Sequence, residues 1–208
     1  MKVLNLYAGI GGNRKLWKNV QVTAVEINPK IANIYQSFFP EDRVIVGDAH
    51  KYLLENFKDY DFIWSSPPCP THSRIRNIAG VGRGQNKPVY PDMRLYQEII
   101  LLMQYARFEP KWVIENVKSY YDPLIRPFEC ERHYFWSNFV INKANIPNDR
   151  IHQDIIGSKP VYGFDVNSFD FPDKRLLLRN LVFPKLGKYV LECAFKYKQK
   201  MIVRDETK

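Results

Sequence analysis

The sequence of 208 residues lacks any apolar run that approaches the roughly 20 residues of a membrane-spanning helix. Nor does its start have the layout of a signal peptide, because the short apolar run leads into glycines and not into a cleavage site. Cysteine is scarce, and Cys69, Cys130 and Cys193 are too far apart to form a Cys-x-x-Cys pair. This spacing argues against a zinc site and against a disulfide framework. We therefore expect a metal-free protein of a reducing cytoplasm, without a membrane partner.

Acidic residues are in deficit, with 22 Asp and Glu against 31 Lys and Arg, which gives a formal net charge of +9. This basic balance suits a polyanionic partner, although it also suits a charge kept for solubility, and composition leaves both open. Apolar and charged residues are present in ordinary amounts, at 45% and 25%. These proportions are typical of a globular protein, and the length suffices for one domain with a sizeable core.

Strand and helix patterns alternate through the first two thirds of the chain. The expected strands cover 3–7, 22–27, 44–46, 62–65 and 112–114. The expected helices cover 13–19, 29–39, 50–57 and 92–108, and a final helix covers 181–201. This order predicts an α/β fold, a Rossmann-like doubly wound sheet of mostly parallel strands. Ligands should gather at the carboxyl ends of those strands.

Two stretches depart from this alternation. Residues 71–91 are rich in Gly, Arg, Asn and Pro without periodicity, and so long a loop inside a compact domain is usually functional or disordered. Residues 142–173 carry many Pro, Asn, Asp and Gly residues, with enough apolar ones to pack as a small irregular lobe. We therefore expect a core over 1–140, a small lobe over 141–178, and a segment over 179–208 whose helix returns to the core.

A glycine-rich turn, LYAGIGG at 6–12, follows the first expected strand. Glycines there allow a ligand to approach the backbone, although an ordinary glycine turn would look the same. The second strand ends in Glu26, which is placed to accept hydrogen bonds from two ribose hydroxyls. The third ends in Asp48, which could accept from an adenine amino group or cap the following helix. Because the turn lacks the Gly-x-Gly-x-x-Gly spacing that suits a pyrophosphate, S-adenosylmethionine, which has no phosphate, fits it better.

The fourth expected strand runs directly into a proline pair and a cysteine, SSPPC at 65–69. Two prolines fix the backbone, so Cys69 would be held rigidly at the sheet edge as a nucleophile, with a buried structural cysteine as the alternative. The fifth strand ends in Glu115 at the neighbouring strand end, where this residue could face Cys69. A thiolate beside a carboxyl group suits covalent attack on a ring that must be protonated at nitrogen.

Seven motifs in this order make the sequence resemble the DNA cytosine-5 methyltransferase family, including its phage and bacterial members and the animal de novo branch. They are LYAGIGG, VEINP, GDAH, SPPCPTHS, IENV, RHYFWSNF and RNLVFP. The resemblance spans nearly the whole chain, from Leu4 to about Glu192. The resemblance implies the fold of S-adenosylmethionine-dependent methyltransferases. It also implies that Cys69 attacks carbon 6 of a cytosine flipped out of the duplex, and that Glu115 hydrogen-bonds to ring nitrogen 3 and the exocyclic amine. Carbon 5 then takes the methyl group.

The resemblance further implies which residues bind each ligand. The cofactor residues would be Tyr7, Ala8, Gly9, Gly11, Gly12, Glu26, Ile27, Asp48, Ala49, Pro67, Asn180 and Val182. The DNA-binding residues would be Ser73, Arg74, Arg76, Arg83, Lys87 and Arg94, although a solvated loop would look alike. The implied partner is double-stranded DNA in a bacterial or phage-infected cell. The lobe is short for target recognition, so a second copy or a partner subunit could assist it. The polar side chains of the lobe that could read base edges are Asn145, Asn148, Arg150, Gln153, Ser158 and Lys159.

The sequence departs from the family where Arg-x-Arg usually precedes an aromatic strand, since the run at 131–134 is ERHY. Aligning the aromatics strictly puts His133 at the arginine that touches the cytosine, and a slip of one residue puts Arg132 there. We favour Arg132 as the third catalytic residue, because a fixed cation suits the carbonyl oxygen of the base. His72 could touch a phosphate, but we expect an exposed loop histidine.

Two other functions remain open. One is cytosine-5 methylation of RNA, as in the tRNA-modifying branch of the same family, although the Cys-Phe-Thr stretch typical of that branch is missing. The other is a catalytically inactive DNA-binding homologue, which the retained Cys69, Glu115 and Glu26 argue against.

Overall fold

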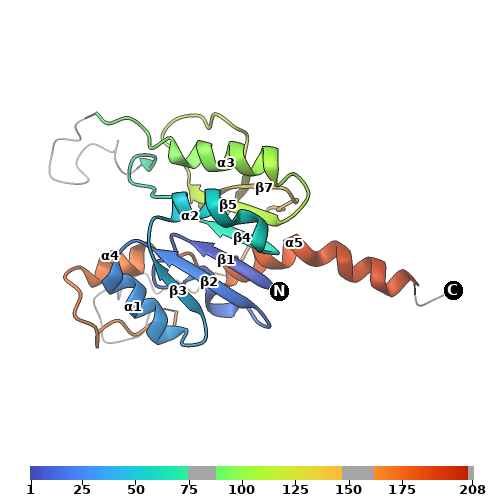
Figure 1. Cartoon of the computed structure of the whole chain (residues 1–208). Coiled ribbons are helices and arrows are strands. Elements are labelled where there is room, and N and C mark those ends of the chain that lie inside the picture. The colour runs from blue at the N-terminus through green and yellow to red at the C-terminus, as the bar shows by residue number, and fades with distance from the viewer. Residues whose placement is uncertain (75–87, 147–161, 206–208) are drawn as a thin grey trace.

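The computed structural model describes residues 1–74, 88–146 and 162–205, with side chains in the last helix described up to residue 195. Its strands form one seven-stranded sheet in the order β3-β2-β1-β4-β5-β7-β6 (Figure 1). Their bounds are β1 Lys2–Leu6, β2 Gln21–Glu26, β3 Arg43–Val46, β4 Phe62–Ser65, β5 Lys111–Val117, β6 Phe128–Cys130 and β7 His133–Ser137. The first five strands run parallel, and β7 and β6 complete the sheet antiparallel. The predicted doubly wound, mostly parallel α/β fold is confirmed.

The strand order reverses between β1 and β4, which are direct neighbours with Leu6 paired to Ser65. In open α/β sheets such a reversal leaves a crevice at the carboxyl ends of the two strands. The glycine turn after β1 and the proline–cysteine segment after β4 therefore leave the sheet side by side.

Helices cover both faces of the sheet (Figure 1). They are α1 Pro29–Phe38, α2 Ala49–Asn56, α3 Arg94–Tyr105, α4 Lys174–Arg179 and α5 Pro184–Asp205, with short 3-10 turns η1 Asn13–Leu16 and η2 Phe57–Asp59. Along β4, Ile63 packs in the cluster that includes α2 and α3, whereas Phe62 and Trp64 pack in the cluster that includes α5. Because both faces are buried, β4 is a continuous apolar run without polar alternation.

The structure differs from the expected elements in three places. The helix expected over 13–19 is only the four-residue turn η1, since Trp17 leaves it in an extended conformation, packs against Phe62 and Trp64, and donates to the carbonyl oxygen of Gly187. The aromatic strand β7 was expected from the family motif, but its hairpin with β6 was not. Neither was α4, which begins where the Asp173 side chain accepts a hydrogen bond from the backbone N–H of Leu176.

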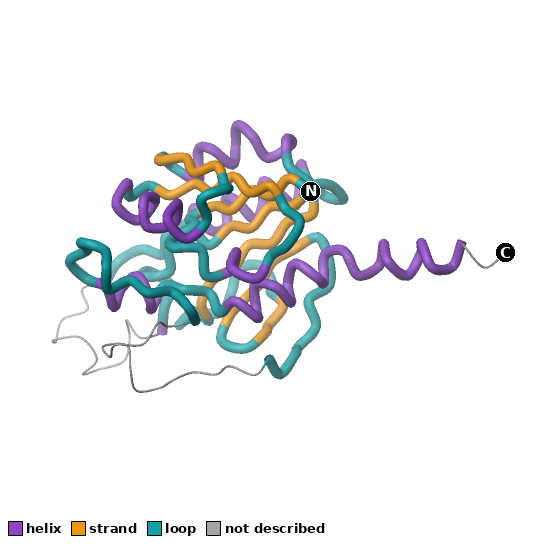
Figure 2. The backbone as a smooth tube through the Cα atoms, turned by 90° about the horizontal axis from the view of Figure 1, so that it is seen from below, coloured by secondary structure: helices purple, strands orange, loops and turns teal. Residues whose placement is uncertain are grey.

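The described end of the expected lobe lies against the core. Phe164 and Val166 are buried in one cluster with Ile34 and Tyr35 of α1. Residues 147–161, which include most polar side chains expected to read bases, lie outside the described residues. The division into 1–140, 141–178 and 179–208 stays a prediction. Figure 2 shows the far part of α5 extending away from the body of the protein.

Candidate active site

The glycine turn between β1 and η1 forms one wall of a cavity. A Cβ atom on Gly12 would lie 2.5 Å from the carbonyl oxygen of Val182, so only glycine lets the C-terminal segment approach so closely. Gly9 adopts a φ of +54°, and a Cβ there would meet nothing within 4 Å. The turn closes with the Gly11 N–H donating to the carbonyl oxygen of Ala8 over 3.0 Å. The turn is therefore packed on one side by protein and open on the other.

Glu26, the last residue of β2, holds this turn in place. Its Oε2 accepts from the backbone N–H of Gly9 and its Oε1 from that of Asn28, both over 3.0 Å. The side chain is buried, yet each carboxylate oxygen can accept a further hydrogen bond. The neighbouring Ile27 is 68% exposed, an unusual environment for so apolar a side chain. Glu26 and Ile27 thus place an acceptor and an apolar surface at the end of β2.

Asp48 caps α2. Its Oδ1 accepts from the backbone N–H groups of His50 and Lys51 over 2.9 and 3.3 Å. Asp48 therefore has the helix-capping role that was one of its two predicted roles. Among the described residues, its Oδ2 makes no hydrogen bond. Ala49 is buried in the core cluster beneath α2. Of this pair, only Asp48 exposes a group that could meet a ligand.

The cavity is closed on its other side by the α4–α5 junction. Six of the residues expected to bind the cofactor line it: Tyr7, Ala8, Gly9, Gly12, Asn180 and Val182. Ile10, from the same glycine-turn motif, lines it as well. Sequence reasoning missed Asn13, Ile31, Ser66, Leu176, Leu177 and Leu181, which complete it. Leu176 and Leu177 belong to helix α4, which the sequence did not predict. Only the motif RNLVFP, which begins at the last residue of α4, indicated that this part of the chain lines the cavity.

The proline–cysteine segment is tied to β5. The carbonyl oxygen of Pro67 accepts from the side-chain amide of Asn116 over 2.9 Å, and Pro67 is itself buried. The Cys69 carbonyl oxygen accepts from the backbone N–H groups of His72 and Ser73 over 2.9 and 3.0 Å, which makes a tight turn. The expectation that His72 is exposed is wrong. Its side chain is buried, and its Nδ1 lies 2.5 Å from the hydroxyl of Tyr121.

Glu115 lies within β5, opposite Phe135 of β7, and is buried. His133 Nε2 lies 3.6 Å from Glu115 Oε1. Arg132 instead lies in the β6–β7 turn, with its side chain exposed. The register of the hairpin therefore brings His133 toward Glu115, which favours the strict alignment of the aromatics over our preference for Arg132.

Burial, and after it the negative charge of Glu115, raises the pKa of the Cys69 thiol above its usual 9.0. The two candidate catalytic groups are therefore close enough to influence each other. The thiol of the free protein is mostly protonated at neutral pH, so a thiolate must form as the nucleophile reacts.

This raised pKa predicts how Cys69 reacts with iodoacetamide. Only the thiolate is alkylated, so the rate should rise about tenfold per pH unit from pH 7 and show no plateau by pH 9. Mass spectrometry of the labelled peptide measures the rate, and the buried Cys130 and Cys193 serve as slow internal references. A plateau already at pH 7 would contradict the raised pKa.

The basic residues expected to meet DNA are partly engaged with the protein. Arg74 donates from Nε to the carbonyl oxygen of Ser119 over 2.9 Å, and Ser73 forms a backbone bridge with Ser119. Arg94 makes an ion pair of 2.6 Å with Asp92, whose pKa this hydrogen bond lowers. A phosphate at Arg94 would compete with that carboxylate. Arg76, Arg83 and Lys87 lie outside the described residues.

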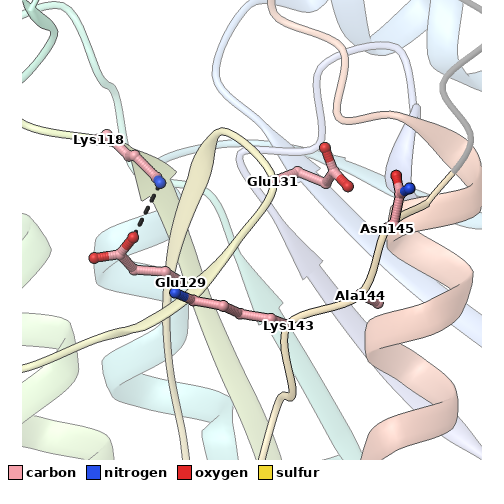
Figure 3. A pocket seen from close by; sticks show the side chains of 6 residues that line it. All are labelled: Lys118, Glu129, Glu131, Lys143, Ala144 and Asn145. Atoms are coloured by element: carbon pink, nitrogen blue, oxygen red, sulfur yellow. Dashed lines mark hydrogen bonds and ion pairs between the residues drawn. The ribbon is translucent and has the colours of Figure 1, made fainter.

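A polar groove extends beyond the end of β5 (Figure 3). Its lining residues are Lys118, Glu129, Glu131, Lys143, Ala144 and Asn145. Lys118 and Glu129 are joined by an ion pair of 3.0 Å, and the other polar side chains come from the hairpin turn and the start of the expected lobe. The groove is therefore of mixed charge, and Asn145 is the one side chain expected to read bases whose position is described.

Two expected absences can be examined over the described ranges. No group of three or more His, Cys, Asp or Glu residues there is arranged to hold a metal ion. No described helix combines the length and apolar character needed to cross a membrane.

Residues 1–123 match the family model of the C-5 cytosine-specific DNA methylase. The tRNA (cytosine(38)-C(5))-methyltransferase of Homo sapiens is 26% identical over 226 residues, which cover 97% of this chain and 53% of that protein. The type II methyltransferase M1.HgaI of Avibacterium volantium is 26% identical over 153 residues, which cover 70% of this chain and 38% of that protein. The chain spans about half the length of the curated relatives it matches. A crystal structure of a Spodoptera frugiperda DNMT2 mutant is 26% identical, with a TM-score of 0.37 over 56% of this chain and 35% of that one.

Proposed function

The chain belongs to the C-5 cytosine-specific DNA methylase family, and we propose that it methylates carbon 5 of cytosine in double-stranded DNA through a covalent adduct of Cys69. The observation that carries the proposal is the pairing of Cys69 with Glu115. Cys69 lies in the segment that follows β4, Glu115 lies in the neighbouring strand β5, and the charge of Glu115 acts on the thiol. Ser66, which begins the segment that carries Cys69, lines the cavity under the glycine turn, and this supports a nucleophile and a proton donor that act next to that cavity.

S-adenosylmethionine is the cofactor, and when bound it supplies an electrophilic methyl group. The residues present fit it. Glu26 retains acceptor capacity for ribose hydroxyls, and Ile27 offers an exposed apolar surface for an adenine ring. The open side of Gly9 leaves room for the ligand.

The chain's own residues then perform the steps as follows. The Cys69 thiol loses its proton to the Glu115 carboxylate and Sγ bonds to carbon 6 of the flipped base, while Glu115 passes that proton to ring nitrogen 3, so that electron density moves to carbon 5. Carbon 5 takes the methyl group and then loses its own proton to a base. The bond between carbon 6 and sulfur breaks, nitrogen 3 returns its proton through Glu115 to the sulfur, and the ring regains its double bond. His133 lies near enough to Glu115 to orient that carboxyl group.

A tRNA substrate is the second candidate, because five of the six curated relatives are tRNA (cytosine(38)-C(5))-methyltransferases. DNA is supported by the family model and by the type II relative. The absence of a Cys-Phe-Thr stretch also favours DNA.

Transfer of a radioactive methyl group tests the substrate. We expect incorporation into duplex DNA. Bisulfite sequencing should then show that the methylated cytosines resist conversion. The same assay with unmodified tRNA should give no product. Incorporation into tRNA alone would overturn the choice of DNA, and no incorporation into either would overturn the activity. A Cys69→Ala preparation controls for a contaminating methylase.

A further inference from the structure

One carboxylate is buried where the pattern of its helix predicts an apolar residue. Glu98 lies on the face of α3 that carries Leu95, Ile99 and Leu102, and its exposed fraction is 0%. A buried carboxylate is costly unless hydrogen bonds compensate for its lost hydration. Among the described residues, no Lys or Arg forms an ion pair with it. Its stability in this position therefore depends on neutral donors and on one histidine.

Three side chains from three different elements approach this carboxylate. The Tyr7 hydroxyl donates to Glu98 Oε1 over 2.6 Å, and the Ser65 hydroxyl donates to Oε2 over 2.6 Å. His50 Nδ1 lies 2.9 Å from Oε1. Hydrogen bonds to an ionised acceptor are shorter and stronger than those between neutral groups, so Glu98 restrains all three elements.

Two of these elements form walls of the cofactor cavity. Tyr7 itself lines the cavity, and Ser65 immediately precedes Ser66, which lines it as well. Tyr7 also has a φ of +54°, a conformation that is unfavourable for an aromatic residue and persists only where the surroundings impose it. The bond to Glu98 is a restraint of that kind.

We propose that Glu98 is a positioning residue that fixes the two cavity walls at Tyr7 and Ser66 relative to each other and so prepares the cavity for S-adenosylmethionine. This inference rests on the proposed function, because it concerns the same cavity. Glu98 does not touch the cofactor, since it is fully buried behind these walls.

His50 gives an independent readout of the same network. The hydrogen bond to Glu98 is the largest cause of its raised pKa, against a smaller opposing effect of burial, and Asp48 and Arg94 are the other charged groups that act on it. Glu98→Gln should therefore lower the pKa of His50 toward 6.5, which an NMR titration measures.

Calorimetry with S-adenosylhomocysteine tests the proposal directly. Tyr7→Phe keeps the ring and removes only the bond to Glu98, and it should weaken binding about tenfold, as should Glu98→Gln. Tyr7→Phe should add little in the Glu98→Gln background, because both changes remove the same interaction. Tyr35→Phe is the matched control. It deletes a 2.8 Å bond from a buried tyrosine to the buried Asp42, neither of which lines the cavity, and should lower Tm without changing Kd.

The outcomes separate the two proposals. Unchanged Kd in Tyr7→Phe, with the parent binding normally, would reduce Glu98 to a structural residue and overturn this inference alone. A folded parent that fails to bind S-adenosylhomocysteine would overturn the proposed function and this inference with it. If Glu98→Gln does not fold, Tyr7→Phe and Ser65→Ala still decide the question.

Discussion

Cys69→Ala should abolish methyl transfer while cofactor and DNA binding remain largely intact. The thiol is the group proposed to bond to carbon 6, and alanine offers no substitute nucleophile. The side chain is only partly buried, so its removal leaves the packed core unchanged. Transfer of a radioactive methyl group to duplex DNA measures activity, and calorimetry with S-adenosylhomocysteine measures binding. Persistent turnover by Cys69→Ala would exclude the covalent route.

Duplex DNA containing 5-fluorocytosine makes the adduct itself visible. Fluorine at carbon 5 cannot leave as a proton does, so the final elimination is blocked and the protein stays bonded to the base. The parent should form a complex that survives denaturing electrophoresis, and Cys69→Ala should form none. Cys193→Ala is the matched control, because Cys193 is a buried residue of α5 and its removal should leave the adduct intact.

Glu115→Gln should slow methyl transfer about 10²–10⁴-fold, the usual contribution of a positioned proton donor. Glutamine has the shape of glutamate and can hydrogen-bond to the base, but it cannot give a proton to nitrogen 3. The strand pairing of β5 with β7 involves backbone groups, so the substitution should not disturb it. Single-turnover rates at saturating DNA measure the effect, and thermal unfolding checks the fold.

The same substitution should have the opposite effect on the thiol. The charge of Glu115 contributes to the raised pKa of Cys69, so Glu115→Gln should lower that pKa. Alkylation of Cys69 at pH 8 should then be faster than in the parent, while methyl transfer is slower. Near-normal methyl transfer with a lowered Tm would instead mean that Glu115 only stabilises the strand end.

The sequence by itself determined the fold class and the edge of the sheet at which the site lies. Alternating strand and helix patterns predict parallel strands, and the carboxyl ends of parallel strands meet at one edge. The glycine turn, Glu26, Cys69 and Glu115 each follow or end a strand, so their common location follows from local pattern alone. The family motifs supply the proposed roles of these residues, because the chemistry depends on residue type and order along the chain.

Only the tertiary structure decided which distant groups meet. Glu98 lies between Leu95 and Leu102 on the apolar face of an amphipathic helix, where the periodicity predicts an apolar residue. That periodicity does not predict that its hydrogen-bond partner is Tyr7, 91 residues away. His133 was brought toward Glu115 by the register of the β5–β7 pair, which the ambiguous alignment of ERHY could not fix. Local periodicity sets which face of an element is buried. The identity of a long-range hydrogen-bond partner depends on how the elements pack, because that partner is separated from the residue by many turns and strands.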